Sequence, residues 1–205
     1  MYRVNHIFYS LQGEGRNTGR AAVFVRFAGC NLRCPFCDTE FSTYSEMSAE
    51  TLLAAIFSAV GGFAVDTPPL IVLTGGEPTL QADEALIDLL HHHGYEVAME
   101  SNGTRPAPDN LDWLTVSPKD WWHPSDEWWR ENPHRINELK IVFDEDTPAR
   151  LPSLPLPPAA FLYLQPCDTG DAARNAAIVH QCVDYIKRHP RWRLSLQTHK
   201  LIGIE

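Results

Sequence analysis

The sequence lacks several features that would place it in other classes of protein. No apolar run approaches the roughly 20 residues that a membrane-spanning helix needs. The first six residues do not form the apolar core of a secretory signal. The sequence also has few basic residues: it contains 17 Lys and Arg against 26 Asp and Glu, which gives a formal net charge of −9. We therefore expect a cytoplasmic protein that binds neither nucleic acid nor a membrane.

The five cysteines do not form a plausible disulfide framework. Their number is odd, and Cys30, Cys34 and Cys37 lie within eight residues of one another, far from Cys167 and Cys182. Clustered thiols in a reducing compartment are typical of a metal site instead. The spacing therefore predicts metal binding rather than cross-linking.

What is present is the composition of an ordinary globular protein. The chain has 205 residues, of which 44% are hydrophobic and 21% charged, enough for one domain with a substantial core. Apart from the proline-rich residues 148–158, we find no low-complexity segment, and there is no internal repeat. We expect residues 1–205 to form a single domain.

Hydrophobic patterning predicts alternating strands and helices. The apolar and β-branched residues 21–28 predict the first strand, and Ser48 is a suitable N-cap for a helix that ends near Val60. Further strands are expected at residues 70–73, 96–100, 111–116, 139–143, 161–164 and 193–197, with helices at 82–92 and 171–188. Repeated strand–loop–helix units favour an α/β fold with a mainly parallel sheet. Residues 121–129 show no clear period, and residues 148–158 are expected to be a surface connection.

The three clustered cysteines form a C-x3-C-x2-C motif directly after the first expected strand. Thiolates are soft ligands that suit iron–sulfur clusters or zinc. Three of them on one loop can hold three irons of a [4Fe–4S] cluster and leave the fourth open to a small molecule. The alternative is a structural zinc site completed by Cys167 or a histidine, in a non-catalytic interaction module. Zinc sites usually contain paired C-x2-C units, and the sequence has no second pair.

A second motif, Gly75-Gly76-Glu77-Pro78, ends the expected strand at residues 70–73. Glycines let the backbone approach a ligand closely, and α/β folds bind ligands at the carboxyl ends of parallel strands. Taken alone, the motif is equally consistent with a simple strand-to-helix turn.

In this order the two motifs resemble those of the radical S-adenosylmethionine superfamily, in which an aromatic residue, here Phe36, precedes the last cysteine. The resemblance implies a partial, open β/α barrel that holds a [4Fe–4S] cluster on Cys30, Cys34 and Cys37, and S-adenosylmethionine. The contacts it implies for S-adenosylmethionine are Phe36, Cys37, Asp38, Gly76, Glu77, Ser117, Pro118, Lys119, Gln165, Pro166, Cys167 and Asp168. From the residues alone, the alternatives are that Lys119 is a solvated charge and Cys167 a small buried residue.

Shorter motifs along nearly the whole chain resemble one family of that superfamily, the 7-carboxy-7-deazaguanine synthases. These motifs are Leu11–Gly15, Cys37–Thr39, Ser101–Thr104, Ser117–Lys119, Leu139–Lys140, Gln165–Pro166 and Gln197–Lys200. The resemblance implies a lyase of queuosine and 7-deazapurine biosynthesis. Its reaction would convert 6-carboxy-5,6,7,8-tetrahydropterin to 7-carboxy-7-deazaguanine and ammonia, by a ring contraction that a 5′-deoxyadenosyl radical starts.

The same resemblance implies a pterin site made of Leu11, Gln12, Gly13, Glu14, Arg26, Thr74, His199 and Glu205, and a Mg²⁺ ion on Thr39. The residue types suit these roles. Gln12 and Glu14 can pair with the guanine-like edge of a pterin, Arg26 with a carboxylate, and a Thr39 hydroxyl with magnesium. From the residues alone, Arg26 is also explained by a salt bridge at a strand edge, and Thr39 by capping of a loop.

The partners that the sequence suggests are an electron donor, which we expect to be flavodoxin-like, and a second copy of the chain. Exposed aromatic residues often mark interfaces, so Trp121, Trp122, Trp128 and Trp129 indicate a homodimer. An alternative in the same superfamily is a small enzyme that installs a glycyl radical on a partner protein. Such an enzyme would not need Gln12, Glu14 and Arg26.

Overall fold

The structure, a computed structural model, describes residues 1–37, 39–61, 63, 65–119, 135–153 and 161–205. These residues build one sheet of nine strands in the order β3-β1-β2-β4-β5-β6-β7-β8-β9. The strands are β1 (Tyr2–Leu11), β2 (Ala21–Phe27), β3 (Ser45–Met47), β4 (Leu70–Gly75), β5 (Val97–Ser101), β6 (Trp113–Val116), β7 (Glu138–Phe143), β8 (Phe161–Pro166) and β9 (Trp192–Leu194). The expected α/β fold is confirmed.

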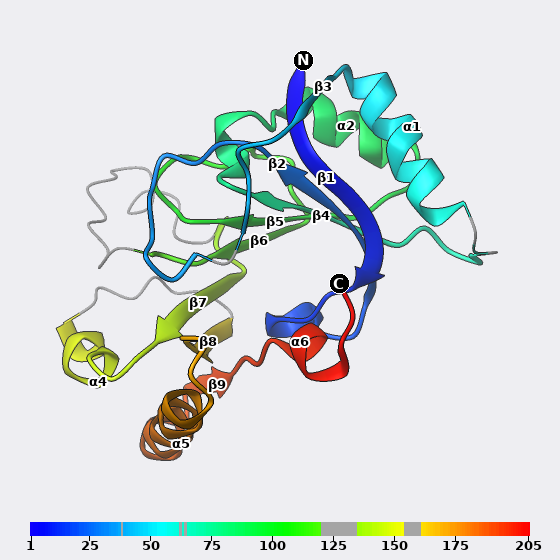
Figure 1. Ribbon diagram of the computed structural model, residues 1–205. Coiled ribbons are helices and arrows are strands. Elements are labelled where there is room, and N and C mark those ends of the chain that lie inside the picture. The colour runs from blue at the N-terminus through cyan, green and yellow to red at the C-terminus, as the bar shows by residue number, and fades with distance from the viewer. Residues whose placement is uncertain (38, 62, 64, 120–134, 154–160) are drawn as a thin grey trace.

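Seven of these strands, from β2 to β9 across the sheet, are mutually parallel. Only β1 is antiparallel to both of its neighbours, β2 and β3. The edge strands β3 and β9 do not pair with each other within the described residues, so the curved sheet stays open (Figure 1). This is the open, partial barrel that the family resemblance implied.

The helices are α1 (Ala49–Val60), α2 (Glu84–His92), α4 (Thr147–Arg150), α5 (Ala172–Arg188) and α6 (Thr198–Ile202), with 3-10 turns η1 (Gly15–Asn17), η2 (Pro78–Leu80) and η4 (Leu151–Ser153). The N-cap residues of the three longest helices, α1, α2 and α5, are Ser48, Asp83 and Asp171. Each of these side chains accepts the backbone N–H three residues further along, which satisfies a donor that the first helical turn leaves free. None of the helices in the described ranges is sufficiently long and apolar to span a bilayer.

The two faces of the sheet differ in character because side chains alternate along each strand. The outer face is apolar: Val25, Leu73 and Met99, for example, pack in one core with residues of α1, α2 and α5. The inner face has only a small apolar floor, where Ala22, Leu70, Val72 and Ala98 meet. Further along the same strands the inner face becomes polar, with Arg26, Thr74 and Glu100, and β7 adds Lys140. A ligand site is therefore built into one face of the sheet.

Several elements differ from the sequence-based expectations. Residues 21–27 form the second strand rather than the first, and β1, β3, α4 and α6 were not anticipated. The last strand is Trp192–Leu194 rather than residues 193–197. The proline-rich stretch begins within α4 and η4, because Pro148 stands in the first turn of α4, where a missing N–H costs nothing. Residues 154–158 and the tryptophans at 121–129 lie outside the described residues.

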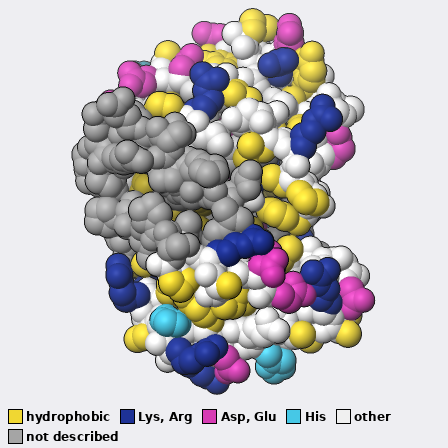
Figure 2. Space-filling view, turned by 90° about the vertical axis from the view of Figure 1, so that its left-hand side faces the viewer, with side chains coloured by type: hydrophobic (Ala, Val, Ile, Leu, Met, Phe, Trp, Pro, Cys, Tyr) yellow, Lys and Arg dark blue, Asp and Glu magenta, His cyan; other side chains and the backbone are white. Residues whose placement is uncertain are grey.

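Charges on the surface are mixed rather than sorted. Figure 2 shows basic and acidic side chains interspersed with apolar ones over the described part of one face. Exposed ion pairs such as Arg20–Glu96 and Arg174–Glu145 bring opposite charges together at 2.6 and 2.7 Å. Solvent screens exposed pairs of this kind, so they contribute little to stability, and the charges that matter for function are to be sought in the interior.

Candidate active site

A cavity of about 700 Å³ opens at the carboxyl ends of the parallel strands. Its walls come from the ends of β2, β4, β5, β6, β7 and β8 and from the loops that follow them, together with β1 and the C-terminal segment. The carboxyl ends of parallel strands are where α/β folds bind ligands, because the loops that leave them converge there. The cavity is therefore the candidate active site.

The cysteine motif lies on the loop between β2 and β3. A hydrogen bond from Gly29 N–H to the Phe41 carbonyl (3.2 Å) closes the base of this loop. Cys34 and Cys37 are joined by a turn (Cys37 N to Cys34 O, 3.1 Å). Cys30, Cys34 and Cys37 are not in disulfide bonds, and all three line the cavity.

The donor set fits an iron–sulfur cluster. Within the described residues, no three His, Cys, Asp or Glu side chains converge as they would around a metal ion. The chemistry of the loop nevertheless matches, because three thiols from eight residues face one cavity and thiolates are the usual ligands of such clusters. Cys167 also lines the cavity, from the end of β8, and burial raises the pKa of its thiol.

The Gly-Gly-Glu-Pro turn is tightly bound to the base of the cysteine loop. Gly76 N–H donates to the Phe27 carbonyl (3.0 Å) and Glu77 N–H to the Gly29 carbonyl (2.9 Å). Gly75 has a φ of +116°, a conformation that favours glycine, and a Cβ on Gly76 would lie 1.9 Å from the Gly29 carbonyl oxygen. Both glycines are therefore required by the close approach of two backbones at the cavity wall.

The side chain of Glu77 is turned into the protein instead. It is fully buried and accepts hydrogen bonds from Thr79 N (3.0 Å), Ser101 Oγ (2.9 Å) and Asn102 N (2.7 Å). The carboxylate thus joins the turn after β4 to the end of β5, and it does not line the cavity. Any contact between this turn and a ligand comes from Gly75 and Gly76, which do line it.

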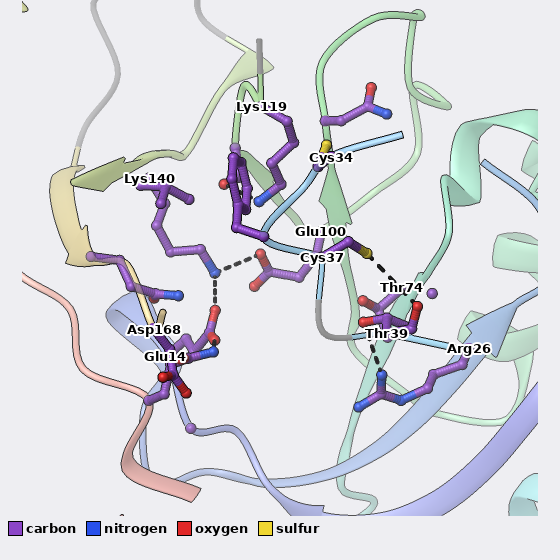
Figure 3. Close-up of a pocket in the computed structure, with 18 of the residues that line it drawn as sticks. Glu14, Arg26, Cys34, Cys37, Thr39, Thr74, Glu100, Lys119, Lys140 and Asp168 are labelled. Atoms are coloured by element: carbon purple, nitrogen blue, oxygen red, sulfur yellow. Dashed lines mark hydrogen bonds and ion pairs between the residues drawn. The ribbon is translucent and has the colours of Figure 1, made fainter. Parts of the chain in front are cut away.

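One wall of the cavity carries a ring of charged and polar side chains (Figure 3). Lys140 Nζ lies 2.6 Å from Glu14 Oε2 and 2.9 Å from Glu100 Oε2. Gln12 Nε2 donates to Glu100 Oε1 (3.3 Å), and Glu14 N–H donates to Gln12 Oε1 (3.1 Å), which closes the ring. Gln197 Nε2 donates to Glu14 Oε1 (3.0 Å). Side chains from four separate parts of the sequence, around residues 12–14, 100, 140 and 197, thus hold one another in place.

Burial and proximity shift the pKa values of these groups. Burial alone would raise the pKa of Glu14, but the Lys140 ammonium lowers it to about 2. Burial alone would lower the pKa of Lys140, but Glu100, Glu14 and Glu138 raise it above its ordinary value. Burial raises the pKa of Glu100, with Lys140 opposing. Lys140 and Glu14 are therefore an ion pair throughout the neutral range.

Beside the ring lie two further titratable groups. Glu138 accepts the Arg16 backbone N–H (2.8 Å), and burial, followed by the Glu100 charge, raises its pKa to about 7. Lys119 lines the cavity and donates to Ser117 Oγ (2.8 Å), and burial, followed by the charge of Lys140, lowers its pKa. Lys119 is thus a partly buried amine of the cavity wall rather than a solvated surface charge.

The opposite side of the cavity holds Arg26 and Thr39 (Figure 3). Arg26 Nη1 lies 3.4 Å from Thr39 Oγ1, and the guanidinium carbon lies 5.3 Å from the centre of the Phe8 ring. Arg26 forms no ion pair with any described residue, so a salt bridge at a strand edge does not explain it. Its charge faces a cavity that can admit a carboxylate.

The C-terminal segment closes the cavity next to the ring. Thr198 N–H and Oγ donate to the Gly13 carbonyl (3.0 and 2.9 Å), and a Cβ on Gly13 would collide with the His199 ring. Ser10 Oγ donates to the Glu205 main-chain oxygen (2.6 Å). His199 and Glu205 therefore reach the cavity because β1 and the loop after it hold the segment in place.

Most of the predicted site residues come together in this cavity. Those that line it are Leu11, Gln12, Gly13, Glu14, Arg26, Cys30, Cys34, Phe36, Cys37, Thr39, Thr74, Gly76, Ser117, Lys119, Gln165, Pro166, Cys167, Asp168, His199 and Glu205. Glu77 and Pro118 do not line it, and Asp38 lies outside the described residues. Sequence reasoning assigned no role to Glu100, Lys140 or Gln197. Lys140 and Gln197 belong to the motifs Leu139–Lys140 and Gln197–Lys200, and Glu100 is the last residue of the strand expected at 96–100. The sequence therefore contained a signal for each of the three.

Comparison with known proteins agrees with this site. The sequence profile of the Radical SAM superfamily matches residues 24–125. A protein of Bacteroides thetaiotaomicron named 7-carboxy-7-deazaguanine synthase is 44% identical over 206 residues, which cover 100% of this chain and 99% of that protein. A protein of the same name from Nitratidesulfovibrio vulgaris is 44% identical, with 99% of each chain covered. The crystal structure of QueE from Escherichia coli has a TM-score of 0.72 at 30% identity and covers 95% of this chain and 93% of its own.

Proposed function

Because the chain belongs to the 7-carboxy-7-deazaguanine synthase family of the radical S-adenosylmethionine superfamily, we propose that it converts 6-carboxy-5,6,7,8-tetrahydropterin to 7-carboxy-7-deazaguanine with release of ammonia. This is a step of queuosine and 7-deazapurine biosynthesis. One observation carries the proposal: three cysteines, an arginine without a carboxylate partner among the described residues and a ring of hydrogen-bond acceptors line the same cavity. The glycyl-radical and zinc alternatives find no support in the relatives.

The cluster and the cosubstrate occupy one side of the proposed site. Cys30, Cys34 and Cys37 would hold a [4Fe–4S] cluster, and reductive cleavage of S-adenosylmethionine at its open iron supplies a 5′-deoxyadenosyl radical. Gly76 and the segments 117–119 and 165–168 line the adjoining wall, apart from Pro118. There the Gly76 backbone and the Lys119 ammonium can orient the amino-acid part of the cosubstrate.

The pterin would lie between Arg26 and the ring. Arg26 can form a charge-assisted pair with the substrate carboxylate. At the other end, Glu14 and Glu100 offer acceptors to the N–H groups of the 2-amino-4-oxo edge. The substrate is thus held at both ends, which fixes the ring carbon that loses its hydrogen relative to the cosubstrate.

We also propose a Mg²⁺ ion at Thr39. The hydroxyl of Thr39 is a hard oxygen donor, and it lies 3.4 Å from the guanidinium that would bind the substrate carboxylate. A magnesium ion there would share that carboxylate with Arg26 and fix its orientation. A flavodoxin-like electron donor and a homodimer complete the proposal, the latter from tryptophans outside the described residues.

The test is anaerobic turnover of reconstituted, reduced protein with S-adenosylmethionine and the carboxylated tetrahydropterin, with and without Mg²⁺. We expect ammonia and 7-carboxy-7-deazaguanine in equal amounts, detected by mass spectrometry. Arg26→Ala should bind S-adenosylmethionine normally but lose about 2–5 kcal/mol of substrate affinity, because a buried carboxylate is left without its partner. Arg26→Lys should restore part of it. No product from reduced, cluster-loaded wild-type protein would refute the function, and equal loss of both ligands by Arg26→Ala would refute the division of roles.

A further inference from the structure

We propose that Lys140 is the positioning residue that gives the site its preference for a heterocycle with an amino–oxo edge. Lys140 does not contact the reacting atoms. It holds the carboxyl groups of Glu14 and Glu100 as two fixed acceptors facing the cavity. This inference rests on the proposed function and names the group that selects the substrate class.

The geometry of Lys140 is that of a buried cation shared by two carboxylates. Its side chain is 4% exposed, and Nζ lies 2.6 Å from Glu14 and 2.9 Å from Glu100. The residue stands on β7, whereas Glu100 stands on β5 and Glu14 on the loop after β1. An ammonium with two carboxylate partners holds both at short, charge-assisted distances. Lys140 therefore fixes the separation of two acceptors from distant parts of the sequence.

The carboxylates keep acceptor capacity for a ligand. Each has two oxygens with about four acceptor positions. Lys140 and Gln197 use one position on each oxygen of Glu14, and Lys140 and Gln12 do so for Glu100. Both side chains also line the cavity. A ligand with adjacent N–H donors can complete the set, whereas a carbonyl at the same place would face negative charge.

The charges around Lys140 explain why its removal would change recognition. Glu14, Glu100 and Glu138 face it from three elements, and Lys119 is the other amine close to these groups. Without the Lys140 ammonium, like charges in a poorly solvated site disfavour ionisation of all three carboxylates. Glu14 and Glu100 would separate or retain a proton, and a protonated carboxyl presents a donor where the ligand needs an acceptor.

The experiment measures binding to the anaerobic, cluster-loaded enzyme with S-adenosylmethionine but without reductant, so that no turnover occurs. The probes are 6-carboxytetrahydropterin and its analogue with a 2-oxo in place of the 2-amino group. Wild type should prefer the amino compound by at least about 100-fold, because a site built to accept from an N–H group rejects an analogue without it. Lys140→Met should reduce this ratio to below about fivefold while the affinity for S-adenosylmethionine changes less than about twofold.

Two variants separate positioning from a general structural role. Lys140→Arg should recover most of the preference, because a guanidinium can bridge two carboxylates. Lys187→Met, on an exposed position of α5, should match wild type. The inference is overturned if Lys140→Met keeps the wild-type ratio, or if it weakens cosubstrate and pterin binding equally. If wild type binds neither probe, the proposed function itself fails. If wild type prefers the amino compound and Lys140→Met does too, only the role of Lys140 falls.

Discussion

At the scale of single residues, the cavity depends most on places where two backbones nearly touch. Gly76 is one: the turn after β4 and the base of the cysteine loop are joined by the hydrogen bond from Glu77 N–H to the Gly29 carbonyl. The loop that carries the three cysteines and the glycine turn after β4 are therefore joined through their backbones. A change in one is expected to displace the other.

Gly76→Ala should consequently lose S-adenosylmethionine affinity by at least about tenfold, because the added Cβ would lie 1.9 Å from a carbonyl oxygen that belongs to backbone and cannot rotate away. Equilibrium binding to the cluster-loaded protein measures the effect. Gly61→Ala is the matched control, since Gly61 has a φ of −57° and its nearest neighbour would be 3.2 Å away. Wild-type affinity in Gly76→Ala would show that the close contact is not needed.

Residue motifs also mark the limit of what the sequence predicts. Cys30, Cys34 and Cys37 could be assigned because ligands on one short loop are close in any fold. The mutual contacts of Gln12, Glu14, Glu100 and Lys140 could not, since these residues come from two strands and a loop, and their contacts depend on how the strands align. Local spacing predicts local chemistry, and pairing across strands requires the structure.

At the scale of elements, β1 shows why a strand can lack the alternating pattern of apolar and polar residues from which strands are predicted. Its pairing with β2 is irregular between Val4 and His6, so the alternation of buried and exposed residues changes phase part-way along. The seven parallel strands were expected from short apolar or β-branched stretches, of which the continuous run at residues 70–73 is typical of a buried parallel strand. The helices α4 and α6 are too short, at four and five residues, to carry a helical period.

Strand β7 begins with a carboxyl group that should make stability depend on pH. The pKa of Glu138 is raised to about 7 from its ordinary value of 4.5, so between these pH values the folded state binds more protons than the unfolded state. The free energy of unfolding should therefore fall as pH rises through this range, by up to about 3 kcal/mol from this one group. The stabilisation is complete below about pH 4.5 and lost above about pH 7.

Glu138→Gln tests this directly, because an amide oxygen can still accept the Arg16 N–H but cannot ionise. The free energy of unfolding of the variant minus that of the wild type should rise by about 3 kcal/mol between pH 5 and pH 8, because only the wild type loses stability over this range. Denaturant unfolding followed by circular dichroism gives the difference at each pH. Glu145→Gln, in an exposed ion pair, should show no such rise. A difference that is constant with pH would mean that Glu138 titrates normally.

At the scale of the whole molecule, the end of β1 and the C-terminal segment meet at the cavity. Ser10 and His6 on β1 contact Glu205, at 2.6 and 3.1 Å, and Figure 1 shows the C-terminus beside the end of β1. The lining residues run from Phe8 to Glu205. The sequence predicted the parallel sheet from its order of elements, whereas the contact between β1 and the C-terminal segment follows from the antiparallel strand that the prediction missed. A ligand in the cavity can therefore contact segments from β1, from the ends of the parallel strands and from the C-terminal segment.

Ligand binding should consequently stabilise the entire chain against unfolding. A ligand at 100 times its dissociation constant adds about 2.7 kcal/mol, which for a chain of this size corresponds to a rise in Tm of about 5–10 °C. We expect this rise when S-adenosylmethionine is added to anaerobic, cluster-loaded protein and unfolding is followed by scanning calorimetry. The triple variant Cys30→Ser, Cys34→Ser, Cys37→Ser should keep its fold, because these side chains lie outside the apolar core. Without thiolates it offers no open iron, so its Tm should rise by less than about 2 °C. An equal rise in the wild type and the triple variant would mean that the cosubstrate binds independently of the three cysteines.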